Sequence, residues 1–197
     1  MAVTFRQIGP CFAAEVHGLD LARALAPDEV AAVHGGMDRY AVLVFHDQKL
    51  DDEQQLAFTR SLGDIERAIG TSLRAPDELR LPTTFADVSN LDKDHQVFAR
   101  DDRRRLFGLG NRLWHSDSSF KVVPAKYSIL HARSVPSKGG NTEFAYMRAA
   151  YDALDAAPGP SASHSSANTH SSSRASSSAS PTSPRTSACA SRPCASG

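Results

Sequence analysis

The 197-residue sequence is poor in cysteine and tryptophan, with three cysteines and a single tryptophan. Only Cys11 precedes residue 155, which argues against a disulfide framework, and Cys189 and Cys194 lack the further nearby ligands that would indicate zinc. No apolar run approaches the roughly 18 residues of a membrane span, and the first residues lack the basic-then-apolar order of a signal peptide. The sequence therefore predicts a cytoplasmic protein without membrane association.

An excess of charge of either sign is also missing, because 22 basic residues balance 22 acidic ones. The last forty residues, 158–197, contain three arginines but no Asp, Glu or Lys. Removing these arginines leaves 19 basic against 22 acidic residues, a net charge of −3 for the body of the chain. A mildly acidic body without a basic stripe argues against nucleic-acid binding.

The same forty residues hold fifteen serines and lack Val, Ile, Leu, Met and all aromatic residues. Such a segment buries too little apolar surface to offset its ordering entropy. We therefore expect one domain over residues 1–155 and a disordered, Ser/Ala/Pro-rich tail over residues 156–197. The abrupt change near residue 155 fits a change of reading frame, or a natural low-complexity linker.

Hydrophobic periodicity and capping signals predict several elements in the first 63 residues. They are two short strands within residues 3–16 and a helix of about 12 residues from Pro27 that closes around Gly35 and Gly36 or slightly later. A buried strand at 41–45 follows, and then a helix from a capping box at Asp51 and Gln54 to Gly63. Further on, the segment 64–110 is irregular, with possible strands only at 85–91 and 96–98. Alternation then predicts antiparallel strands over 127–135 and 141–145, and a helix follows over 147–154.

A His-x-Asp triplet at His115 and Asp117 lies within a strand-like run. In an extended backbone both side chains point to the same face. A neutral imidazole and a carboxylate are two of the three ligands of a 2-His-1-carboxylate site for non-haem Fe(II). The spacing alone is equally compatible with an ordinary hydrogen-bonded pair at a strand edge.

Three motifs, taken together, resemble a known enzyme family. They are the run 111–120 with Trp114-His115-Ser116-Asp117, the run 139–144 with Gly139-Gly140-Asn141-Thr142, and the run 147–154. This combination is similar to Fe(II)- and 2-oxoglutarate-dependent dioxygenases of the taurine and 2,4-dichlorophenoxyacetate type, and more so to the aryloxyacetate branch. The resemblance implies a mixed α+β protein with a double-stranded β-helix, or jelly roll, of which residues 1–155 form the N-terminal portion with flanking helices.

Carried over residue by residue, the resemblance implies that His115 and Asp117 bind Fe(II). It further implies that Thr142 donates a hydroxyl hydrogen bond to a carboxylate of the co-substrate 2-oxoglutarate, and that Asn111 faces the substrate. Without the resemblance, Thr142 reads as an ordinary cross-strand threonine.

The implied reaction is an O2-dependent hydroxylation of the carbon beside the ether oxygen of an aryloxyacetate-like acid. A taurine- or sulfonate-type dioxygenase and a non-catalytic scaffold fragment are the alternatives, and a homo-oligomer is left open. The family also requires a distal histidine ligand and an arginine for 2-oxoglutarate. We find neither in a matching context, since His131 lies in a predicted strand and His164 and His170 lie in the tail. The sequence thus predicts a truncated or frame-changed chain with impaired activity.

Overall fold

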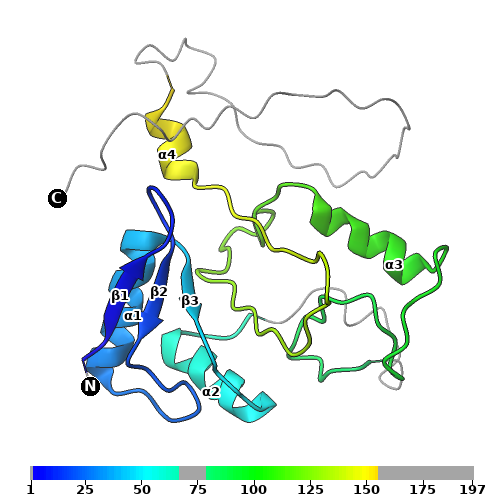
Figure 1. The fold of residues 1–197 in the computed structure, drawn as a ribbon, viewed down its shortest axis with the longest axis horizontal. Coiled ribbons are helices and arrows are strands. Elements are labelled where there is room, and N and C mark those ends of the chain that lie inside the picture. Colours follow the sequence, from blue (N-terminus) through cyan, green and yellow to red (C-terminus); the bar gives the residue numbers. More distant parts are fainter. Residues whose placement is uncertain (1, 67–78, 155–197) are drawn as a thin grey trace. The chain divides into compact units, whose positions relative to one another are not determined.

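The computed structural model describes residues 2–66 and 79–154 (Figure 1). The predictions about residues 67–78 and about the tail, including its disorder, therefore lie outside the described residues. The described residues fall into two compact units, one containing residues 2–63 with 132–154 and the other residues 64–66 with 79–131. We call them the N-terminal unit and the central unit. No helix in the described ranges is long and apolar enough to cross a membrane.

A three-stranded sheet in the order β1-β2-β3 organises the N-terminal unit. β1 (Thr4–Gln7) pairs antiparallel with β2 (Ala14–His17), which confirms the predicted strand pair. β3 (Leu43–Phe45) pairs parallel with β2. The prediction that β3 is buried was wrong. All three of its residues are only half-buried, because β3 is an edge strand with a single neighbour in the described sheet.

Helix α1 (Pro27–Tyr40) begins as predicted, with Pro27 in the first turn and the Glu29 carboxylate accepting a 2.9 Å hydrogen bond from the Ala26 backbone N–H. It ends at Tyr40, slightly after Gly35 and Gly36, as the sequence prediction allowed. A Cβ at Gly36 would stand 2.5 Å from a ring carbon of Phe5, so this glycine lets β1 approach the helix. Close packing against Phe5 therefore accounts for Gly36.

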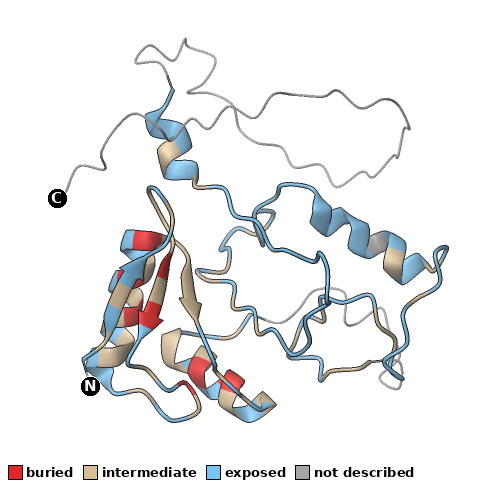
Figure 2. Cartoon of the chain, viewed as in Figure 1, coloured by how far each residue is buried: buried red, intermediate tan, exposed pale blue. Residues whose placement is uncertain are grey.

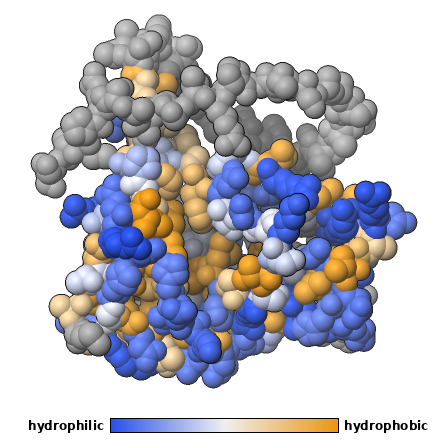
Figure 3. All heavy atoms as spheres, viewed as in Figure 1, coloured by the Kyte–Doolittle hydropathy of each residue, from blue (hydrophilic) through white to orange (hydrophobic). Residues whose placement is uncertain are grey.

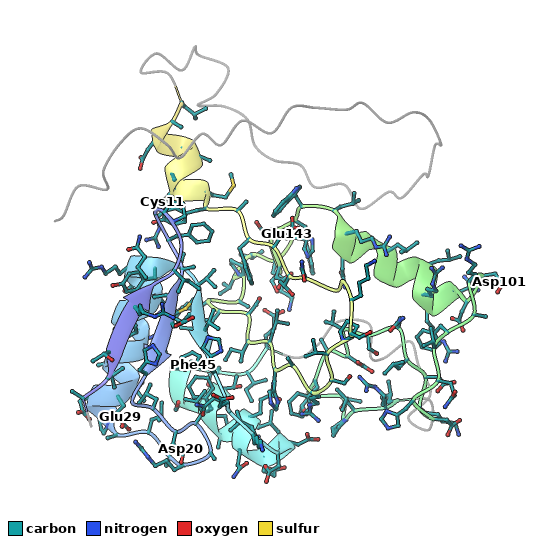
Figure 4. All side chains as sticks on the ribbon, viewed as in Figure 1. Cys11, Asp20, Glu29, Phe45, Asp101 and Glu143 are labelled. Carbon is teal, nitrogen blue, oxygen red and sulfur yellow. The ribbon has the colours of Figure 1, made fainter. Side chains whose placement is uncertain are left out.

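Helix α2 (Asp52–Leu62) has the predicted capping box. The Asp51 carboxylate accepts the Gln54 N–H at 2.8 Å, and the Gln54 side chain accepts the Asp51 N–H at 2.9 Å. Phe45 of β3, labelled in Figure 4, meets Phe58 of α2 edge to face, and the ring centroids lie 6.0 Å apart. Phe58 belongs to a small core between the sheet and the helices, whose buried residues are red in Figure 2. Its buried hydrophobic residues are Ala14, Val16, Leu21, Val33, Tyr40, Leu56 and Phe58.

The later part of the N-terminal unit contacts α2 and the segment between β1 and β2 without forming a sheet. The predicted strands at 127–135 and 141–145 are both absent, because neither run finds a strand partner among the described residues. Instead, Arg133 forms a 2.6 Å ion pair with Asp52 of α2. The predicted last helix is confirmed as α4 (Met147–Asp152), and Tyr146 before it stacks on Phe12 with ring centroids 5.1 Å apart.

The central unit contains little regular structure. The predicted strands at 85–91 and 96–98 are reduced to one isolated bridge between Leu91 and Val97. The sequence prediction missed helix α3 (Arg103–Gly108) and the 3-10 helix η3 (Leu109–Arg112), because a run of arginines resembles a solvated loop. Many large apolar side chains of this unit are exposed, Trp114 at 68% and Phe120 at 65% among them. Figure 3 shows apolar patches of this kind between polar ones on the face in view.

Candidate metal centre

The His-x-Asp triplet follows η3 in the central unit. Contrary to the prediction, it does not lie in a strand. Residues 114–116 are irregular and a turn begins at Asp117. Ser118 has a φ of +54°, a left-handed conformation that interrupts the two-residue period of an extended chain. The strand prediction was therefore wrong for this stretch.

His115 and Asp117 nevertheless point at one another. The Nε2 atom of His115 lies 3.2 Å from Oδ1 of Asp117, and the two side chains are 48% and 59% exposed. Bonds of about 2.1 Å from one metal ion to two ligand atoms at a right angle place those atoms about 3.0 Å apart. The observed separation fits two neighbouring ligands of a first-row divalent metal.

The backbone fixes which nitrogen of His115 is available to a metal. Nδ1 lies 2.7 Å from the carbonyl oxygen of Leu113. A carbonyl can only accept a hydrogen bond, so Nδ1 carries the proton and the lone pair of the neutral imidazole is on Nε2. Nε2 is the atom that faces Asp117. In metal-binding histidines, the ring nitrogen that does not bind the metal commonly donates a hydrogen bond of this kind.

The carboxylate of Asp117 is also held in place by a hydrogen bond. The hydroxyl of Ser128 donates a 2.6 Å hydrogen bond to Oδ2 of Asp117, the oxygen that does not face His115. Oδ1 is left directed at the histidine. Sequence reasoning missed Ser128, because a serine in an alternating run carries no signal of such a contact.

Glu66 fastens the turn that follows Asp117. Its carboxylate accepts a 2.8 Å hydrogen bond from the Ser118 hydroxyl and lies 2.5 Å from Nζ of Lys121. The hydrogen bond from Lys121, followed by that from Ser118, lowers the pKa of Glu66 below its usual value and outweighs the opposing effect of desolvation. Glu66 therefore remains ionised in acid that would protonate an unpaired glutamate. Its contacts with Ser118 and Lys121 persist under those conditions.

The two remaining predicted site residues are not brought to this pair by any contact among the described residues. Asn111 lies in η3, and its residue is exposed. Thr142 belongs to the N-terminal unit, in an exposed irregular segment before α4. Their assigned roles stay predictions.

A third metal ligand does not join the pair within residues 2–66 and 79–154, where no group of three His, Cys, Asp or Glu side chains could hold a metal ion. His131 has a buried Nδ1 without a hydrogen-bond partner in the described structure. His164 and His170 lie outside the described residues. The donor set is thus chemically right for iron but holds two of three ligands.

Comparison with known proteins decides the family. Residues 4–193 match the family described as "Taurine catabolism dioxygenase TauD, TfdA family". The chain belongs to the TauD/TfdA dioxygenase family. This confirms the predicted membership in an oxidoreductase family.

Two relatives act on aryloxy acids according to their names. The chain is 44% identical over 154 residues to the alpha-ketoglutarate-dependent 2,4-dichlorophenoxyacetate dioxygenase of Cupriavidus pinatubonensis, a match covering 78% of this chain and 53% of the relative. It is 36% identical over 149 residues to the (S)-phenoxypropionate/alpha-ketoglutarate-dioxygenase of Delftia acidovorans, covering 76% and 48%. The chain spans about half the length of the curated relatives it matches. These names agree with the predicted resemblance to the aryloxyacetate branch.

Among solved structures, the chain resembles AAD-2 in complex with Mn(II) and N-oxalylglycine, with a TM-score of 0.68 and 51% identity over 79% of this chain and 51% of that one. In that complex Mn(II) stands in for Fe(II), and N-oxalylglycine stands in for 2-oxoglutarate. The cofactors predicted from the sequence are therefore those of the family.

Proposed function

We propose that the chain contributes the first two iron ligands of an Fe(II)- and 2-oxoglutarate-dependent dioxygenase that acts on an aryloxyacetate-like acid. The 3.2 Å approach of His115 Nε2 to Asp117 Oδ1 is the observation that carries this proposal. The Leu113 carbonyl supports it, because it leaves the Nε2 lone pair free for a metal. The names of the relatives support the substrate class.

We further propose that residues 1–155 form the N-terminal portion of a jelly-roll domain and that residues 156–197 are a separate tail. Similarity to AAD-2 over 79% of the chain supports the fold. The described residues form a mixed α and β structure with one small sheet, which fits part of such a domain. A frame change near residue 155 remains our explanation for the tail's composition.

In the proposed site, His115 and Asp117 hold Fe(II), Thr142 donates its hydroxyl to a carboxylate of 2-oxoglutarate, and Asn111 faces the substrate. Bound iron, with 2-oxoglutarate and O2, supplies the oxidising power. Hydroxylation of the carbon beside the ether oxygen gives a product that breaks down to a phenol and glyoxylate. The chain's own task is to orient the two ligands and the substrate.

We expect this chain to bind iron weakly and to turn over slowly, because two protein ligands hold a metal less well than three. The absence of a three-ligand group within the described residues supports that expectation. The same observation favours a second candidate function, a non-catalytic scaffold fragment. That alternative predicts that His115→Ala changes neither metal affinity nor activity.

Succinate formation tests the proposal and separates these candidates. Purified chain would be loaded with Fe(II) anaerobically, given 2-oxoglutarate with either phenoxyacetate or taurine, and exposed to O2. We expect slow succinate release that phenoxyacetate stimulates more than taurine and that His115→Ala abolishes. Greater stimulation by taurine would move the chain to the sulfonate branch. Equal, measurable succinate release by wild type and His115→Ala would count against the metal pair and favour the scaffold.

A further inference from the structure

The two oxygens of the Asp117 carboxylate have different neighbours. Oδ1 lies 3.2 Å from Nε2 of His115, and Oδ2 accepts a 2.6 Å hydrogen bond from the Ser128 hydroxyl. The torsion that turns a carboxylate about its last bond is broad, so an aspartate alone does not define which oxygen faces a metal. The hydrogen bond from Ser128 supplies that definition.

The contact is of a strong kind. A hydroxyl donating to an ionised carboxylate at 2.5–2.7 Å is charge-assisted and about twice as strong as a neutral hydrogen bond. It joins residues eleven positions apart, across the turn that begins at Asp117. Ser128 is exposed, so its side chain contributes no core packing. Its hydrogen bond therefore has a local consequence, the orientation of Asp117.

We propose that Ser128 is a positioning residue of the metal site, which holds Oδ2 of Asp117 so that Oδ1 is presented together with Nε2 of His115. This inference rests on the proposed function, since it assumes that the pair binds a metal. The pair is then held at both ends, because the Leu113 carbonyl orients the imidazole and Ser128 orients the carboxylate. Loss of such an outer contact typically weakens metal binding about 10- to 100-fold.

The single tryptophan of the chain gives a direct readout without turnover. Trp114 adjoins His115, so Co(II) bound at the pair is expected to quench its fluorescence. Titration with Co(II) would give dissociation constants for wild type, Ser128→Ala, Ser128→Thr and Ser128→Val. Threonine and valine differ only in a hydroxyl and a methyl group. Ser137→Ala, at another exposed serine, is the matched control.

We expect Ser128→Ala and Ser128→Val to weaken Co(II) binding about tenfold or more, and Ser128→Thr and Ser137→Ala to remain within about twofold of wild type. Equal affinities for the threonine and valine variants would overturn the role of the hydroxyl, even if both variants were less stable. A similar loss in Ser137→Ala would also count against it.

His115→Ala separates this inference from the proposed function. If His115→Ala abolishes quenching and Ser128→Val does not weaken it, the metal pair stands and the role of Ser128 is refuted. If His115→Ala binds Co(II) as wild type does, the metal pair itself is refuted, and the role of Ser128 with it.

Discussion

The Nδ1 atom of His115 lies 2.7 Å from the carbonyl oxygen of Leu113, and this one contact decides which end of the imidazole can bind a metal. Because the acceptor is a backbone atom, replacing the leucine side chain leaves it in place. The lone pair of Nε2 then faces Asp117. In a neutral imidazole, the local chain thus leaves Nε2 as the nitrogen available to a metal.

The pKa of Glu66 should depend on Lys121, whose hydrogen bond is the largest cause of its lowering. Lys121→Met removes that donor, so we expect the pKa of Glu66 to rise toward the ordinary glutamate value of 4.5. Carbon-13 NMR of the side-chain carboxyl, followed from pH 7 to pH 2, measures the change. Lys126→Met is the control, because Nζ of Lys126 lies over the Tyr127 ring instead. An unchanged Glu66 titration in Lys121→Met would contradict the assignment.

Glu29 at the beginning of α1 should make folding stability depend on pH (Figure 4). The hydrogen bond from Arg23, followed by that from the Ala26 backbone, lowers the pKa of Glu29 from 4.5 to about 2. A depressed carboxyl pKa stabilises the folded state above pH 4.5, and this contribution is lost as the pH falls toward 2. Urea denaturation of wild type and Glu29→Gln should therefore differ most near pH 6 and converge by about pH 2. A difference that stays constant over this range would refute the linkage.

The adjacent glycines of α1 should respond in opposite directions to alanine. A Cβ added at Gly35 would meet nothing within 4 Å, so Gly35→Ala should stabilise the chain by up to about 1 kcal/mol through helix propensity. At Gly36 a Cβ would meet the Phe5 ring at 2.5 Å, and that ring is stacked on Tyr40. Overpacking of this kind costs about 1–3 kcal/mol, so Gly36→Ala should destabilise. Urea midpoints for both variants test the contrast, and equal stabilisation by both would show that Phe5 moves aside freely.

Local sequence signals predicted the elements whose causes are local. The capping box joins Asp51 to Gln54 three residues on, and the proline in the first turn of α1 fits there through its own fixed φ and missing N–H. The strands predicted at 127–135 and 141–145 failed for the opposite reason. A strand exists only when another segment takes up its backbone hydrogen bonds, and alternation does not say whether that segment is present.

The same distinction between local and non-local causes applies to the candidate site. His115 and Asp117 were found through their spacing and the family resemblance, whereas the contacts that orient them were not. The Leu113 carbonyl has no side-chain signature, and Ser128 reaches Asp117 only through the path of the intervening turn. Geometry of this kind has to come from the folded chain.

A second histidine–carboxylate pair gives an internal comparison for the central claim. His46 Nε2 lies 3.2 Å from Glu15 Oε1, the same separation as in the proposed site. The Glu15 carboxylate is already bound by Arg6, which is the largest cause of its lowered pKa. A metal ion would therefore compete with Arg6 for the Glu15 carboxylate. Within the described residues, Asp117 forms no ion pair with a lysine or arginine, so a metal ion meets no such competition there.

The most direct test is an NMR titration of the histidine ring protons with substoichiometric Mn(II), with resonances assigned through His115→Gln and His46→Gln. Paramagnetic broadening reports which of the eight histidines lies nearest the bound ion. We predict that the His115 resonance broadens at the lowest Mn(II) concentration and that Asp117→Asn removes this preference. Broadening of His46 first, or equal broadening of all histidines, would contradict the assignment of His115 and Asp117 as the metal site.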